Sequence, residues 1–210
     1  FNGEQRFELI PFYKENYYIS LIAWPVKIED FKIVNLIAID KASNESITKV
    51  PLYIRSLKEK NSKIKISDSF IQNVSTKVLE QSGKEVPNDF VDIFLKQNNL
   101  LREENVLKIE EVSKKYMNKD FINNFSITPF KRLHNAATAG LFGQKRTYYH
   151  NDVKIDEAWH LGIDWASVKR ADIVTINSGK VIFNDYLGIY GNTIIIDHKL
   201  GLQTLYAHTS

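Results

Sequence analysis

The sequence predicts an α+β fold that is mostly β, with a helical middle. Residues 1–66 contain runs rich in aromatic and β-branched side chains, whereas residues 67–125 carry apolar side chains at helical spacing. Residues 126–210 return to short apolar runs separated by glycines and polar turns. We therefore expect a small antiparallel β-sandwich, a helical connector and an antiparallel β domain, in that order.

The N-terminal part shows three strand-like runs, at residues 17–25, 31–40 and 47–54. It contains no histidine, no glycine-rich loop and no pair of carboxylates suited to acid–base work. We interpret this part as a docking or spacer module. The alternative is a sugar-binding surface built from a cluster of tyrosines: Tyr13, Tyr17 and Tyr18.

Two helices are predicted in the middle part. The first begins near Ser67, a good N-cap residue, and ends before Gly83. Its apolar side chains share one face: Ile71, Val74, Val78 and Leu79. The second begins at Asn88 or Asp89 and continues to Tyr116.

The C-terminal part reads as a meander of short antiparallel strands, at residues 173–176, 181–183, 192–198 and 202–208. All five histidines of the chain lie in this part: His134, His150, His160, His198 and His208. Taken singly, each histidine is more often structural than a ligand, so the context of each one decides its interpretation.

Composition excludes several classes of protein. The chain has no cysteine, which excludes disulfide frameworks, thiol catalysis and cysteine zinc ribbons. The net charge of +3 comes from dispersed lysines and arginines, so we expect no nucleic-acid partner. Gly140 and Gly143 have two residues between them where a P-loop requires four, which excludes a nucleotide-binding loop of that type.

The chain starts at Phe1 without a signal peptide and stops at Ser210 inside a patterned run, so we expect it to be part of a longer protein.

One histidine and one carboxylate have the spacing of a candidate metal site. His160 and Asp164 stand four residues apart, and both side chains are normal zinc ligands. On a straight strand they would lie about 13 Å apart, so they converge only if the chain bends. Gly162 supplies the freedom for that bend. His208 ends another predicted strand, where a neutral imidazole would serve as a general base or stabilise an oxyanion.

Several motifs together resemble a known family. They are HLGIDWA from His160, NSGKVI from Asn177, LGIYGN from Leu187 and the stretch from Gly201 to His208. In this order they resemble the LytM/lysostaphin-type zinc metalloendopeptidases of bacterial cell walls. The segment FGQKR, which ends at Arg146, is similar to the start of the same domain, and NNLLR in the helical part is similar to the connector of exported members.

The resemblance implies a function and a site. It implies a zinc endopeptidase that hydrolyses cross-links or stem peptides of peptidoglycan, with His160 and Asp164 as zinc ligands and His208 as a catalytic histidine. It also implies an extracytoplasmic location, in the periplasm or cell envelope, with peptidoglycan peptides as partners. It leaves open a membrane anchor, or an association with other cell-wall proteins through the N-terminal module. The family does not use the histidine of its Asp-His pair as a ligand, so we interpret His198, which follows Asp197, as structural or as a neighbour of the ligands.

One departure from the family matters for the chemistry. The family completes its zinc site with an H-x-H motif, which supplies the third ligand and a second catalytic histidine, and these 210 residues contain no H-x-H. We therefore expect the peptidase domain to be incomplete here. The alternative is an inactive scaffold that regulates other cell-wall hydrolases.

Overall fold

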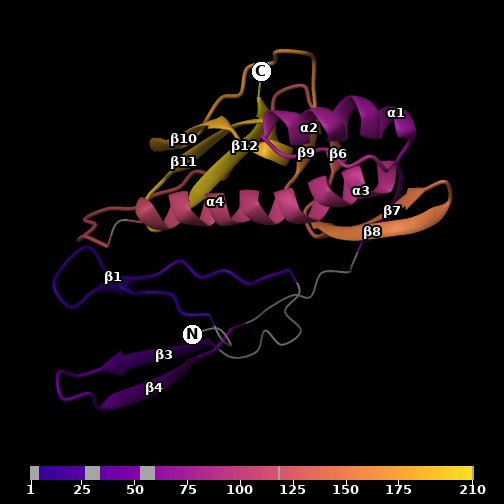
Figure 1. The fold of residues 1–210 in the computed structure, drawn as a ribbon. Coiled ribbons are helices and arrows are strands. Elements are labelled where there is room, and N and C mark those ends of the chain that lie inside the picture. The colour runs from indigo at the N-terminus through magenta and orange to yellow at the C-terminus, as the bar shows by residue number, and fades with distance from the viewer. Residues whose placement is uncertain (1–4, 27–33, 53–59, 118, 210) are drawn as a thin grey trace. The chain divides into compact units, whose positions relative to one another are not determined.

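The fold is α+β, as the sequence predicts, with two helical stretches between strand-rich parts (Figure 1). The computed structural model describes most of the chain: residues 5–26, 34–52, 60–117 and 119–209. Residues 31–33 and 53–54, which belong to two of the predicted strands, lie outside the described residues.

The contacts divide the chain into two compact units. The first comprises residues 1–59 and 119–124, and the second comprises residues 60–118 and 125–210. The helices thus belong to the same unit as the C-terminal strands. The sequence-based division into residues 1–66, 67–125 and 126–210, which separates a helical connector from the C-terminal domain, stays a prediction.

The first unit contains two antiparallel hairpins. One pairs β1 (Ile10–Pro11) with β2 (Tyr18–Ile19), and the other pairs β3 (Val34–Ile39) with β4 (Glu45–Val50). The sequence led us to expect a small sandwich here, and the described residues form these two separate two-stranded sheets. The expected strand at residues 17–25 is the short β2, because the residues after it have no strand partner in the described part of the chain.

Two helical stretches open the second unit. The first contains α1 (Asp68–Phe70), the π-type turn η1 (Ile71–Ser75) and α2 (Thr76–Gln81). The second contains α3 (Phe90–Leu95), the π-type segment η2 (Lys96–Leu101) and α4 (Arg102–Lys115). Within the described residues, no helix combines the length and the apolar character needed to cross a lipid bilayer.

The helix caps are those that the sequence predicts. The Ser67 hydroxyl accepts a hydrogen bond of 3.2 Å from the Phe70 amide, and the Asp89 carboxylate accepts one of 2.8 Å from the Val91 amide. Each bond satisfies an amide that has no partner inside the helix. The first stretch ends before Gly83, whose φ of 66° lies in the left-handed region that favours glycine.

A three-stranded sheet follows the order β5–β7–β8. Its strands are β5 (Lys60–Lys65), β7 (Gln144–His150) and β8 (Val153–His160). Strand β5 pairs with β7 in parallel, which was not predicted, because the polar run KNSKIK has little of the character of a strand. Parallel strands need a long crossover, and here the crossover contains both helical stretches.

The remaining strands form two antiparallel sheets. One pairs β6 (Ala137–Gly140) with β9 (Asp164–Ala166). The other is the predicted meander, which contains β10 (Lys180–Tyr186), β11 (Asn192–Asp197) and β12 (Gln203–Thr209). A short helical turn, η3 (Gly188–Tyr190), connects β10 to β11. The predicted strand at residues 173–176 is wrong, because this segment is irregular and its Val174 side chain is 76% exposed.

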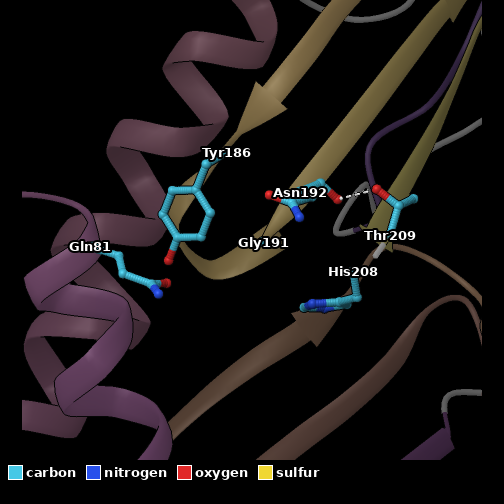
Figure 2. A pocket seen from close by; sticks show the side chains of 6 residues that line it. All are labelled: Gln81, Tyr186, Gly191, Asn192, His208 and Thr209. Atoms are coloured by element: carbon cyan, nitrogen blue, oxygen red, sulfur yellow. Dashed lines mark hydrogen bonds between the residues drawn. The ribbon is translucent and has the colours of Figure 1, made fainter. Parts of the chain in front are cut away.

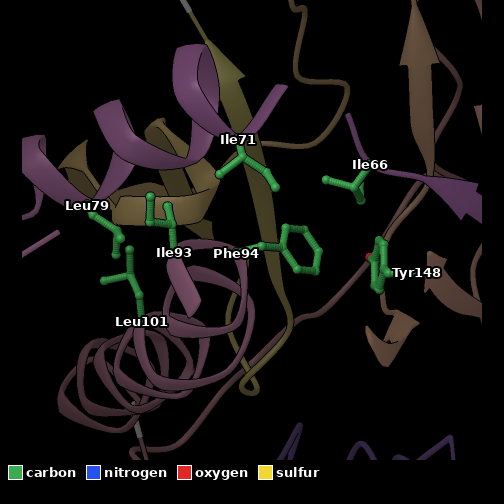
Figure 3. Packing of buried hydrophobic residues seen from close by; sticks show 7 residues of the cluster. All are labelled: Ile66, Ile71, Leu79, Ile93, Phe94, Leu101 and Tyr148. Carbon is green, nitrogen blue, oxygen red and sulfur yellow. The ribbon is translucent and has the colours of Figure 1, made fainter. Parts of the chain in front are cut away.

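The helices cover the strands through a shared apolar core (Figure 3). Phe94 of α3 packs on Tyr148 of β7, with ring centroids 5.1 Å apart. Farther along the second helical stretch, Val112 of α4 packs against Ile182 and Ile195 of the meander. The buried members of the larger cluster come from helices and strands alike: Ile66, Ile71, Leu79, Ile93, Phe94, Leu101 and Tyr148.

Candidate metal centre

The chain bends between His160 and Asp164, as the spacing predicts. Strand β8 ends at His160, β9 begins at Asp164, and the three residues between them lie outside any strand. The bend brings Nε2 of His160 to 3.0 Å from Oδ1 of Asp164. Two side chains that a straight strand would hold about 13 Å apart therefore converge on one point.

The ring of His160 is oriented by the loop that precedes β7. Its Nδ1 lies 2.9 Å from the backbone carbonyl oxygen of Leu141, and the Gly143 amide donates a bond of 2.8 Å to the His160 carbonyl. Because a carbonyl only accepts, Nδ1 donates to Leu141 and Nε2 is the nitrogen that faces Asp164. This is the usual arrangement of a metal-binding histidine, whose second nitrogen donates to a carbonyl or carboxylate. An ionised carboxylate also only accepts, so Nε2 donates to Asp164 here and would give up that proton to bind a metal.

The carboxylate of Asp164 lies between two cationic or potentially cationic groups. Its Oδ2 accepts a hydrogen bond of 2.6 Å from Nη2 of Arg146, and its Oδ1 faces His160. Burial alone would raise the pKa of Asp164, but the hydrogen bond and charge of Arg146, together with the interactions of His160, outweigh burial and lower the pKa. The carboxylate is therefore ionised at neutral pH, which is the form that binds metals.

The donor atoms fit a zinc ion in type. An imidazole nitrogen and a carboxylate oxygen, both common zinc ligands, lie 3.0 Å apart and in direct contact with each other. Among the described residues no group of three histidine, cysteine, aspartate or glutamate side chains comes together. His160 and Asp164 would therefore supply two of the three protein ligands that a catalytic zinc requires.

His208 lies at the end of β12, beside a cavity of about 550 Å³ (Figure 2). Its φ of 56° is in the left-handed region, which is uncommon for a residue other than glycine. Gly191 lies beside the ring: a Cβ there would lie 3.4 Å from Nδ1 of His208, close to ordinary van der Waals contact, and its φ of 62° is in the region that favours glycine. The cavity is lined by Gln81, Tyr186, Gly191, Asn192, His208 and Thr209, and thus by neither His160 nor Asp164.

The helical layer fixes the two segments that surround His208. Ser113 of α4 donates a hydrogen bond of 2.6 Å to the Gln203 side chain at the start of β12. Asn105 of α4 accepts a bond of 3.0 Å from the Ile189 amide in the turn that leads to Gly191. Two side chains of the stretch that the sequence assigned to a connector thus bond to the turn before Gly191 and to the start of the strand that carries His208.

His198 is buried and fully bonded. It is 3% exposed, with Nδ1 at 2.9 Å from the Ser178 carbonyl oxygen and Nε2 at 2.9 Å from the Thr204 hydroxyl. Its ring also packs against Phe130, with centroids 5.6 Å apart. Both nitrogens are occupied, in agreement with the structural interpretation from the sequence.

Replacing His198 with alanine should lower the free energy of unfolding by about 1–3 kcal/mol, because the buried ring would lose its packing against Phe130 and its hydrogen bonds to Ser178 and Thr204. Chemical denaturation of the wild type and the variant measures this loss. The matched control is His134→Ala, at an exposed position, which should change stability by no more than about 0.5 kcal/mol. Equal stability of the two variants would contradict the structural role.

Arg146 and Gly140 are the residues of this centre whose roles the sequence did not reveal. Arg146 belongs to a segment that resembles the family, but nothing in its spacing indicates a contact with Asp164, which is 18 residues away. Gly140 is paired with Asp164 across β6 and β9, and this register depends on the bend. Neither contact follows from a local pattern.

A comparison with known protein families matches the segment that contains His160, Asp164 and His208. Residues 158–210 match the sequence model of Peptidase family M23. The resemblance to LytM-type peptidases, predicted from the motifs, is thereby confirmed over these residues. The matched segment begins two residues before His160 and includes Asp164 and His208.

Curated relatives give a similarity over a stretch of 51 residues. DD-carboxypeptidase/endopeptidase Mpg of Neisseria meningitidis serogroup B is 39% identical over 51 residues, and the protein of that name from Neisseria gonorrhoeae has the same identity. The match covers 24% of this chain and 12% of each relative. The chain thus spans a small part of the length of the relatives that it matches.

Proposed function

We propose that this chain is part of a zinc-dependent endopeptidase that hydrolyses cross-links or stem peptides of bacterial peptidoglycan during cell-wall remodelling. The observation that carries the proposal is the convergence of His160 Nε2 and Asp164 Oδ1 at 3.0 Å, inside the segment that matches Peptidase family M23. The fixed Nδ1 of His160 supports it, because it leaves Nε2 directed at Asp164.

In the proposed site His160 and Asp164 hold the metal, together with a ligand from an H-x-H motif of the family. Zinc, when bound, supplies Lewis-acid chemistry: it polarises a scissile carbonyl and lowers the pKa of water. Asp164 contributes a negative charge that Arg146 and His160 keep ionised. The Leu141 carbonyl keeps His160 in the tautomer that this role requires.

His208 is the proposed proton-transfer residue. Among the described residues its ring nitrogens have no hydrogen-bond partner, and its side chain is exposed beside the cavity. An imidazole in that position is able to accept a proton from attacking water and return it to the leaving amine. Water then adds to the carbonyl carbon as the bond between carbon and nitrogen breaks.

Replacing His208 with alanine in the full-length, zinc-loaded protein should lower the release of peptides from purified sacculi by about 100-fold or more, because it removes a proton-transfer group. The zinc content should stay at the wild-type value, since His208 is not a proposed ligand. Chromatography of the released fragments and metal analysis measure the two quantities. Unchanged release from the variant would contradict the proposed role of His208.

A second candidate function is an inactive scaffold that regulates other cell-wall hydrolases. The observation in its favour is that the described residues contain no third metal-binding side chain at the centre. The same assay separates the candidates, because a scaffold would bind sacculi without releasing fragments from them.

Both candidates act on or beside peptidoglycan peptides, so we propose an extracytoplasmic location for either one. An N-terminal module that contacts the membrane or other cell-wall proteins is compatible with both.

A further inference from the structure

The two oxygens of the Asp164 carboxylate have different partners. Oδ2 accepts a hydrogen bond of 2.6 Å from Arg146, and Oδ1 lies 3.0 Å from Nε2 of His160. The carboxylate is 46% exposed, whereas the Arg146 side chain is 22% exposed. The more buried arginine therefore holds the more exposed aspartate, and it holds only the oxygen that faces away from the histidine.

Arg146 is well placed to fix the direction of Asp164. It lies in the middle of β7, the central strand of its sheet, where it pairs with Ser62 of β5 and Ala158 of β8. A central strand has little freedom to shift, because its backbone is hydrogen-bonded on both sides. Asp164, by contrast, is the first residue of a three-residue strand that follows the bend.

Gly140 makes room for this contact. A Cβ at this position would collide with Oδ2 of Asp164 and would lie 2.6 Å from Nη2 of Arg146. The φ of Gly140 is not in the left-handed region, so the backbone itself would accept alanine. The glycine is therefore needed for the space that the pair occupies and not for its conformational freedom.

We infer that Arg146 is a positioning residue of the metal site, which binds Oδ2 of Asp164 and thereby presents Oδ1 as the single oxygen ligand. This inference rests on the proposed function, since it requires that His160 and Asp164 bind zinc. Hydrogen bonds to a ligating carboxylate usually strengthen metal binding by fixing the ligand. The positive charge of Arg146 acts in the opposite direction, since it repels a divalent cation. We infer that orientation outweighs repulsion.

Zinc affinity of the full-length protein tests this inference with four single variants and one double variant. Arg146→Met should raise the Kd for zinc by about 10–100-fold, and Arg146→Lys should recover part of that loss. Gly140→Ala should weaken zinc binding while both charges remain, and it should add little in the Arg146→Met background. Lys145→Met is the matched control, because Lys145 is the preceding residue of β7 and pairs with Glu157 at 3.0 Å, away from the site.

Two further measurements separate positioning from general destabilisation. The visible spectrum of the cobalt-substituted protein should change in Arg146→Met and stay as in the wild type in Lys145→Met, because it reports on ligand geometry. Thermal unfolding of the metal-free proteins identifies any variant that fails to fold. If Arg146→Met does not fold, the zinc affinities of Gly140→Ala and Arg146→Lys, compared with that of the wild type, decide whether Arg146 positions Asp164.

The outcomes distinguish this inference from the proposed function. Zinc binding by the wild type, with weaker binding and an altered cobalt spectrum in the folded Arg146 and Gly140 variants, supports the inference. Wild-type affinity or tighter binding in folded Arg146→Met would overturn it and leave the zinc site intact. A wild-type protein that binds no zinc would overturn the proposed function as well.

Discussion

Replacing His160 with alanine should abolish zinc binding and lower peptide release from sacculi by more than about 100-fold, in the full-length protein. The reason is that His160 is a proposed ligand, and even partners of metal ligands typically contribute 10–100-fold. Metal analysis after dialysis measures the zinc content, and the fragment assay measures activity. The fold should survive, because among the described residues the ring has two hydrogen-bond partners, the Leu141 carbonyl and Asp164.

The control for this variant is His134→Ala. His134 lies in the same part of the chain and is exposed, and the described structure shows it in no contact with the centre. It should retain full zinc content and full activity. A His160→Ala protein that keeps its zinc and its activity would contradict the proposed role of His160 as a zinc ligand.

Replacing Leu101 with alanine should lower the free energy of unfolding by about 2–5 kcal/mol, the range for buried leucines. Leu101 is 2% exposed and lies in the core that joins the helical layer to the strands (Figure 3). Denaturant titration followed by circular dichroism measures the change. Because α4 holds the start of β12 and the turn before Gly191, activity should also become more sensitive to temperature.

Leu100→Ala is a matched control at the adjacent position. Leu100 is the same residue type in the same helical segment, but it is 48% exposed. Its replacement should change stability by no more than about 0.5 kcal/mol, as is usual at surface sites. Equal losses at the two positions would show that the helical layer does not pack on the strands as described.

Features controlled by neighbouring residues were predictable from the sequence. Ser67 and Asp89 cap their helices because their side chains reach amides two or three residues ahead. The bend between His160 and Asp164 was predictable because two potential ligands four residues apart converge only on a bent chain. The predicted role of Gly162 is not seen, because its φ lies outside the left-handed region that favours glycine. The meander from β10 to β12 follows from short apolar runs with glycine turns between them.

Features that depend on distant pairing were not predictable. Strand β5 is polar and becomes a strand only because β7, about 80 residues later, offers a partner edge. The contact between Arg146 and Asp164 depends on the relative position of two sheets. Residues 173–176 show the opposite error, since apolar side chains there suggested a strand for which the described residues provide no partner.

The position of the metal tests the central claim most directly. Crystals of the full-length, zinc-loaded protein, measured on both sides of the zinc absorption edge, locate the ion without reference to activity. We predict one anomalous peak that contacts both Nε2 of His160 and Oδ1 of Asp164. A zinc peak bound elsewhere, or an intact direct contact between His160 and Asp164 in protein saturated with zinc, would contradict the proposed site.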